Sequence, residues 1–368
     1  MLKVKLNPNI RIISNDNRYI LHDRDKNAYY EIDKYSFDFL SNYNDLEGSD
    51  SNIEDFYYKK SVLIDDDKEQ KPVKVRKPPV ITQIDLFRFD IDKIMNQNEK
   101  LVNFLLSESV QKLSTILYFL SIIMIFITIG ALIQYIPEMD LSSFKKISIT
   151  QFVGLYFSVF FMTVFHELGH ALQCKKYTGY IGSCGCMLFF LLPVLYTDVT
   201  VMRIASKKEK IKIILAGINN QIILGGILGL IFLLQIVITN TFSYFFALLF
   251  FLNLFMFFGN LNPFFKYDGY WLVSTLLSID YLYSKAISSV YHLFTSEKTK
   301  SENWKMILYG FSLIAFYVVS WAITLYYLYS YIRPVLGLPI VIALIILLTL
   351  FILWEINSRY KGIKFEGR

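Results

Sequence analysis

Long apolar segments separated by charged loops fill the chain after about residue 110, whereas the residues before it are polar and mixed in charge. A helix needs ~20 mostly apolar residues to cross the hydrocarbon core of a bilayer. Six segments approach that length: residues 115–136, 152–172, 213–238, 242–259, 306–332 and 335–354. The pattern predicts a mainly α-helical polytopic membrane protein with six transmembrane helices, in a membrane domain of residues 111–365.

In the first 65 residues, apolar and polar positions alternate over shorter segments. Alternating apolar and polar positions predict strands at 10–13, 18–23 and 28–33. Helices are predicted at 34–41 and 53–60, the second N-capped by Ser51. These elements predict a small N-terminal α+β domain. Residues 66–110 are predicted to form a charged, Pro-containing linker that ends in an amphipathic interfacial helix.

Charge gives the membrane domain an orientation. Hydrophobic residues make up 54% of the chain, which agrees with a membrane protein. Lys and Arg gather in segments 173–212 and 263–305 and in the tail after 355, while the alternate loops hold only Lys145, Lys146 and Arg333. Because basic loops stay on the cytoplasmic side, both termini are expected in the cytoplasm of a cell-membrane protein.

The apolar segment 152–172 contains His166-Glu167-Leu168-Gly169-His170. On a helix, HExxH puts two imidazoles one turn apart on one face, where both can bind one zinc ion beside a glutamate that acts as general base. Ionisable side chains at membrane depth are costly and are usually functional. The alternative is a buried histidine pair satisfied by its neighbours.

A catalytic zinc usually has three protein ligands and a water. Asp198 and Asp268 are the candidates for the third ligand, because both fall at the edge of an apolar segment on the side of the motif. Asp268 is favoured because Pro263 breaks the preceding helix and Gly269 permits a tight turn. Broken backbone at membrane depth occurs where protein or a water-filled cavity surrounds it. The alternative is an ordinary turn aspartate at the interface.

Two motifs together resemble the site-2 protease family of intramembrane zinc metalloproteases. They are HELGH in one membrane helix and Asn260-x-x-Pro263-x-x-x-x-Asp268-Gly269 about a hundred residues later. The resemblance covers a catalytic core of residues 151–271. It implies that His166, His170 and Asp268 bind Zn2+, that Glu167 activates water, and that Asn260 orients the substrate or stabilises the oxyanion.

Two departures from the family pattern lie outside the metal ligands. Phe265 stands where the family often has a second proline, and Ile218 replaces the proline of an Ala-Gly-Pro sequence in the third span. The second departure leaves open whether Asn219 or Asn220 assists catalysis.

Residues 180–201 are too few to span the membrane twice and predict a membrane-associated hairpin. The family resemblance implies that this hairpin offers an edge strand to an unwound substrate. The three cysteines, Cys174, Cys184 and Cys186, fall on the predicted cytoplasmic side, so structural disulfides are not expected. Their spacing favours packing over metal binding.

The string from Tyr19 to Leu40 resembles the PqqD-like winged-helix domain, a peptide-recognition element of systems that modify ribosomal peptides. A generic small α+β cap is the alternative. Residues 1–70 contain 15 acidic and 10 basic residues, so this region is acidic and no nucleic-acid partner is expected.

The order of domains resembles peptide zinc metalloproteases of bacterial peptide-modification and bacteriocin systems. This implies an endopeptidase that matures a ribosomally synthesised, modified peptide in the bilayer. A peptide-modifying enzyme and an ABC transporter are the further expected partners. Two alternatives stay open: regulated intramembrane proteolysis of a transmembrane regulator, and a non-catalytic export or immunity protein.

Overall fold

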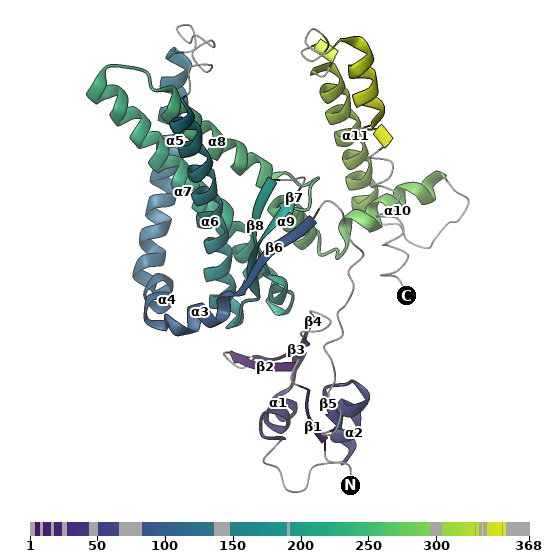
Figure 1. Ribbon diagram of the computed structural model, residues 1–368. Helices are drawn as coiled ribbons and strands as arrows, with labels where there is room; N and C mark the ends of the chain where they lie inside the picture. The colour runs from purple at the N-terminus through teal and green to yellow at the C-terminus, as the bar shows by residue number, and fades with distance from the viewer. Residues whose placement is uncertain are drawn as a thin grey trace. The chain divides into compact units, whose positions relative to one another are not determined.

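The computed structural model divides into two compact units, Met1–Asn262 and Pro263–Arg368 (Figure 1). Each unit is described by itself. The residues described are 4–7, 10–15, 18–23, 28–43, 51–65, 83–135, 148–189, 192–294, 304–327, 329–330, 333, 337–347 and 349–350.

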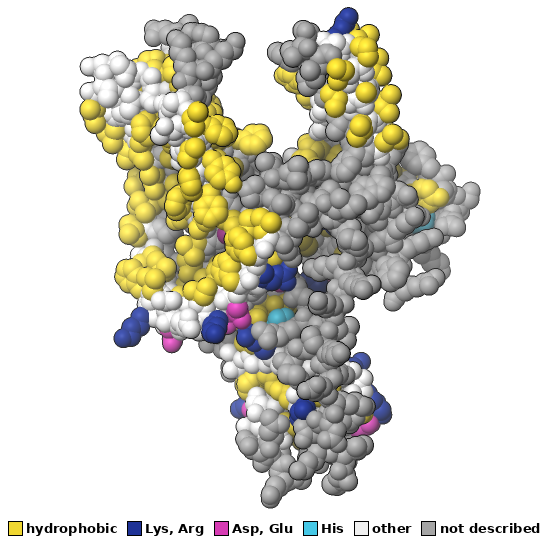
Figure 2. Space-filling view, in the orientation of Figure 1, with side chains coloured by type: hydrophobic (Ala, Val, Ile, Leu, Met, Phe, Trp, Pro, Cys, Tyr) yellow, Lys and Arg dark blue, Asp and Glu magenta, His cyan; other side chains and the backbone are white. Residues whose placement is uncertain are grey.

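Four long helices form the membrane part of the first unit: α5 (Glu108–Tyr135), α6 (Ile149–Thr178), α7 (Lys207–Thr239) and α8 (Tyr244–Leu261). Each is long and apolar enough to cross a membrane. Hydrophobic side chains cover the visible face of this helix group (Figure 2). α7 is the central helix, because it packs against α5, α6 and α8.

Small residues let α7 approach α5 closely. A Cβ atom on Gly226 would lie 2.4 Å from the Cβ of Ser121, and one on Gly229 would lie 2.4 Å from Thr128 Oγ1. Ser121 and Thr128 are both buried. Small residues are typical of helix interfaces in membranes, where dispersion forces require close backbone contact.

The predicted hairpin is present and belongs to a larger sheet. Strands β7 (Ser183–Phe189) and β8 (Leu192–Thr197) are antiparallel, and β6 (Gln83–Asp90) pairs with the other edge of β7. The strand β6 falls in the predicted linker and was not expected there. Its partner lies about a hundred residues later, so no local turn signals the pairing.

The single amphipathic helix predicted after this linker is two short helices. α3 (Ile91–Gln97) and α4 (Glu99–Leu106) meet at Asn98, whose backbone leaves the helical region. The Asn98 side chain donates a hydrogen bond to the Ile94 carbonyl at 2.9 Å, which closes the end of α3.

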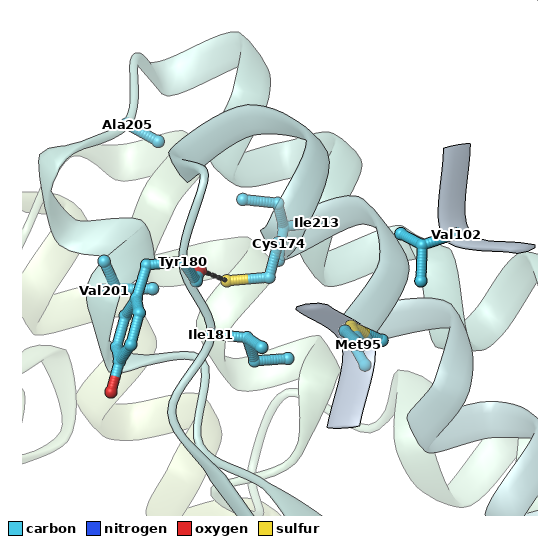
Figure 3. Close-up of a cluster of buried hydrophobic side chains, with 9 residues drawn as sticks. Met95, Val102, Cys174, Tyr180, Ile181, Val201, Ala205 and Ile213 are labelled. Carbon is cyan, nitrogen blue, oxygen red and sulfur yellow. Dashed lines mark hydrogen bonds between the residues drawn. The ribbon is translucent and has the colours of Figure 1, made fainter. Parts of the chain in front are cut away.

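A buried cluster ties these short helices to the ends of α6 and α7 (Figure 3). It also includes residues beside β7 and at the 3-10 helix η4 (Thr200–Ile204). Its members are Met95, Val102, Ala171, Cys174, Tyr180, Ile181, Val201, Ala205 and Ile213. Lys175 Nζ lies 2.8 Å from Asp92 Oδ1, and the same oxygen accepts from the Ile181 backbone at 3.2 Å. The cluster therefore holds α3 and α6 with both apolar contact and a shielded ion pair.

The N-terminal region is rich in strands. β2 (Ile10–Asn15), β3 (Arg18–Asp23) and β4 (Ala28–Ile32) form an antiparallel sheet, and β1 (Val4–Leu6) pairs separately with β5 (Leu63–Asp65). The three strands of the sheet confirm the expected ones, while the β1–β5 pair was not expected.

Helix α1 (Lys34–Ser41) has the predicted bounds, and Asp33 caps it by accepting from the Ser36 backbone at 2.8 Å. Helix α2 (Ser51–Lys59) begins at Ser51, so the assignment of Ser51 as N-cap was wrong. A small core lies between these elements: Ile10, Leu21, Phe39, Leu40, Tyr57, Val62 and Leu63.

The second unit contains α9 (Asp268–Leu277), α10 (Leu282–Phe294) and α11 (Trp304–Tyr327). Tyr309 donates from its hydroxyl to the Pro263 carbonyl at 2.6 Å, which anchors α11 to the start of the unit. Of its helices, α11 is long and apolar enough to cross a membrane.

Six spanning helices are therefore not supported; five are described. In the region predicted as the sixth span, the described residues form the ten-residue apolar helix Leu338–Leu347. This helix begins after Gly337, whose φ is +78°. Residues 335–336, 348 and 351–354 of the predicted span lie outside the described residues.

The contact between α5 and α7 predicts the effect of a larger residue at Gly226. Gly226→Val should force the two helices apart and destabilise the protein by about 1–3 kcal/mol, the usual cost of overpacking. Gly130→Val is the matched control, because a Cβ at Gly130 would meet no atom within 4 Å. Thermal unfolding in detergent measures both changes, and equal melting temperatures for the two variants would contradict the proposed packing.

Candidate metal centre

Two buried histidines face each other on α6. His166 and His170 are one turn apart, with exposed fractions of 4% and 6%. Their Nε2 atoms are 3.1 Å apart. Two nitrogens bound to one tetrahedral zinc ion, each ~2.0–2.1 Å from it, would be separated by roughly 3.3 Å. The two Nε2 atoms are therefore about as far apart as two nitrogen ligands of one zinc ion would be.

The backbone of α7 fixes the ring of His170. Its Nδ1 lies 2.8 Å from the carbonyl oxygen of Ile213. A carbonyl only accepts, so Nδ1 carries the proton and Nε2 keeps its lone pair free. Histidine ligands of metals usually donate their other nitrogen to such an acceptor. The Ile213 side chain is fully buried in the cluster of Figure 3, which keeps this carbonyl in place.

Gly217 allows α7 to pass directly over the two rings. A Cβ atom there would lie 2.4 Å from His170 Nε2 and 2.6 Å from His166 Cε1. A Cβ on Gly169 would similarly lie 2.7 Å from the Ala216 carbonyl oxygen. All three distances are shorter than van der Waals contact, so each position requires glycine for the helices to come this close.

The third predicted ligand reaches the same place. Asp268 is the first residue of α9 and follows the turn that begins at Pro263. One ligand atom from each of His166, His170 and Asp268 lies within 4.8 Å of the other two. Two imidazoles and a carboxylate form a donor set that suits zinc, so the residues present fit such an ion.

The other aspartate considered for this role has local partners. Asp198 Oδ1 accepts from the backbone nitrogen of Thr200 at 3.0 Å and from its hydroxyl at 2.5 Å. These bonds hold the start of η4, which assigns Asp198 a structural role.

Glu167 is half-buried on α6 between the two histidines. Its carbonyl oxygen accepts from Thr197 Oγ1 at 3.5 Å, and Thr197 in turn lies 3.2 Å from Cys184 Sγ. The end of β8 is therefore next to Glu167. Burial raises the pKa of the Cys184 thiol to about 11, so it stays protonated at neutral pH. This favours packing over metal binding for that thiol.

The three asparagines singled out in the sequence differ in whether they lie near the histidines. Asn260 Nδ2 lies 3.5 Å from His166 Nδ1 and 3.3 Å from Gln221 Oε1. Asn220 donates to the Phe165 carbonyl at 2.7 Å, which joins α7 to α6, while Asn219 is exposed. Gln221 was missed by sequence reasoning, although an amide inside an apolar span is itself a signal of a polar partner.

The contacts at Gly217 predict a site-specific defect. Gly217→Ala should displace both imidazoles and weaken zinc binding by ~10–100-fold, the range seen when the support of metal ligands is lost. Gly259→Ala is the control, because a Cβ at Gly259 meets nothing within 4 Å. Zinc affinity is measured by competition with a chromophoric chelator. Unchanged affinity in Gly217→Ala would show that α7 does not confine the rings.

No protein-family model, no curated protein and no solved structure matches this chain. The resemblance to site-2 proteases therefore rests on the motif residues alone. The site is defined by its geometry: a buried histidine pair, a nearby carboxylate, and a glutamate between the histidines on a helix long enough to cross a membrane.

Proposed function

We propose that the chain is an intramembrane zinc metalloendopeptidase. The observation that carries the proposal is the approach of His166, His170 and Asp268 to within 4.8 Å, with Glu167 on the same helix. A histidine pair that only satisfies its neighbours would not require a carboxylate at that distance. A non-catalytic binding protein would not require Glu167 beside it.

The three ligands would hold Zn2+. When bound, the ion would supply Lewis acidity to a substrate carbonyl and to water. Glu167 then carries the proton chemistry. Its carboxylate takes a proton from the attacking water and passes it to the nitrogen of the leaving amine as the peptide bond breaks. The resemblance to site-2 proteases assigns Asn260 to the substrate or the oxyanion.

The sheet supports a docking mode for the substrate. A peptide bond in a helix has its backbone groups engaged, so cleavage requires an extended segment. β6 and β8 are the outer strands of the sheet, and Thr197 at the end of β8 contacts the Glu167 backbone. An extended substrate that pairs with β8 would therefore lie beside the site, with main-chain hydrogen bonds giving affinity.

The proposed substrate is a ribosomally synthesised, modified bacterial peptide. The support is the order of a small N-terminal strand-rich region and a membrane protease core. In this proposal residues 1–65 are a PqqD-like winged-helix domain that captures the peptide, with a modifying enzyme and an ABC transporter as partners. The basic loops support a place in the cell membrane with both termini cytoplasmic, which requires an even number of spans.

The third ligand is tested by metal content. Asp268→Ala should lose bound zinc, because two imidazoles alone bind the ion much more weakly than three ligands. Asp280→Ala is the control, since Asp280 is an exposed aspartate of the same unit. Zinc per purified chain is measured by elemental analysis. Full stoichiometric zinc in Asp268→Ala would remove Asp268 from the ligand set.

The catalytic role is tested at Glu167. Glu167→Gln should keep zinc and fold but lower cleavage by ~10²–10⁴-fold, the usual loss when a general base is removed. Glu108→Gln is the control, because Glu108 is exposed and pairs with Lys112 at the start of α5. Precursor peptides encoded by neighbouring genes are co-expressed with each variant and followed by mass spectrometry. Normal cleavage by Glu167→Gln would contradict the mechanism.

A further inference from the structure

Gln221 is a buried amide with an open hydrogen-bonding position. Its exposed fraction is 1%, and it lies on α7, one turn beyond Gly217. Its Oε1 accepts from Asn260, but its Nε2 has no hydrogen-bond partner among the described residues. A buried amide with both N–H groups unpaired is unfavourable, so this arrangement calls for an explanation.

The neighbours of Gln221 form a chain that ends at the metal centre. Asn253 on α8 donates to the Gln221 carbonyl at 3.0 Å, which fixes α7 against α8. Asn260, also on α8, lies 3.3 Å from the Gln221 side chain and 3.5 Å from His166 Nδ1. A polar path therefore runs from α7 through α8 to a proposed metal ligand on α6.

The metal-binding form of His166 decides how this path must be arranged. A neutral imidazole that binds through Nε2 carries its proton on Nδ1 and needs an acceptor there. His170 has the Ile213 carbonyl. At His166 the side chain of Asn260 lies 3.5 Å from Nδ1. The amide oxygen of Asn260 must then face the ring.

Rotating the side-chain amides of Asn260 and Gln221 by about 180° produces this arrangement without moving the backbone. Oxygen and nitrogen of an amide exchange places on such a rotation. Asn260 Oδ1 then accepts from His166 Nδ1, and Gln221 Nε2 donates to the same oxygen, which has two lone pairs. One Gln221 N–H group is then paired with Asn260, and the position without a partner is taken by the Gln221 oxygen instead of the nitrogen.

We propose that Gln221 and Asn260 form an amide relay that orients His166 as a metal ligand, so both are positioning residues. The inference rests on the proposed metal centre and deepens it. It differs from the role in which Asn260 touches substrate, because it places the effect of Asn260 on metal affinity before any substrate binds.

The experiment uses the full chain purified in detergent and zinc alone as the probe, with affinity measured by chelator competition. Asn260→Leu and Gln221→Leu should each weaken zinc binding, Asn260→Leu by ~10–100-fold, as is typical for loss of a partner of a metal ligand. Asn260→Asp should restore near-normal affinity, because a carboxylate accepts from His166 Nδ1. Gln235→Leu, on the same helix near its other end, should leave zinc affinity unchanged.

The outcomes separate the relay from the metal centre itself. Wild-type protein that binds no stoichiometric zinc would overturn the proposed function. Zinc binding by the wild type with unchanged affinity in folded Asn260→Leu and Gln221→Leu would overturn the relay alone. Asn260→Asp that binds zinc as weakly as Asn260→Leu would also overturn it, because the relay needs only an acceptor at this position. The size-exclusion profile and melting temperature establish that each variant is folded.

Discussion

The close approach of α7 to α6 is the constraint on which the site depends. Four positions on one face of α7 act on α6 or on its partners: Ile213, Gly217, Asn220 and Gln221. Gly217 lies four residues after Ile213, and Asn220 and Gln221 lie three and four residues after Gly217, so all four fall on one side of the helix. The Ile213 carbonyl holds His170, and the absence of a side chain at Gly217 makes room for both histidines. The amides of Asn220 and Gln221 bond to α6 and α8.

α7 contacts α5 and α6 through different kinds of residue, and this explains its composition. Against α5 it needs small residues, because association in lipid relies on close packing. Against α6 it needs polar groups, because imidazoles at membrane depth need partners that water cannot supply. Gly226 and Gly229 serve the first contact and Gly217 the second. A long helix that is apolar on average therefore carries two different interfaces along its length.

The local parts of the site could be predicted from the sequence, because their signals are local. HExxH fixes two side chains one turn apart, and the helix break at Pro263 singles out Asp268. The contacts that cross between helices could not be predicted in this way. Gln221 meets Asn260 only because α7 and α8 pack at a particular register. Strand β6 forms only because β7 lies beside it. The sixth span stays a prediction, because part of segment 335–354 lies outside the described residues.

Strand β6 also changes where the membrane domain begins. The charge pattern suggests a boundary near residue 110, yet the sheet beside Glu167 takes one of its three strands from residues 83–90. A protein truncated at the apparent boundary would lose β6 and leave the main-chain groups of one β7 edge without their strand partners. A membrane fragment that keeps all three strands of this sheet therefore starts before Gln83.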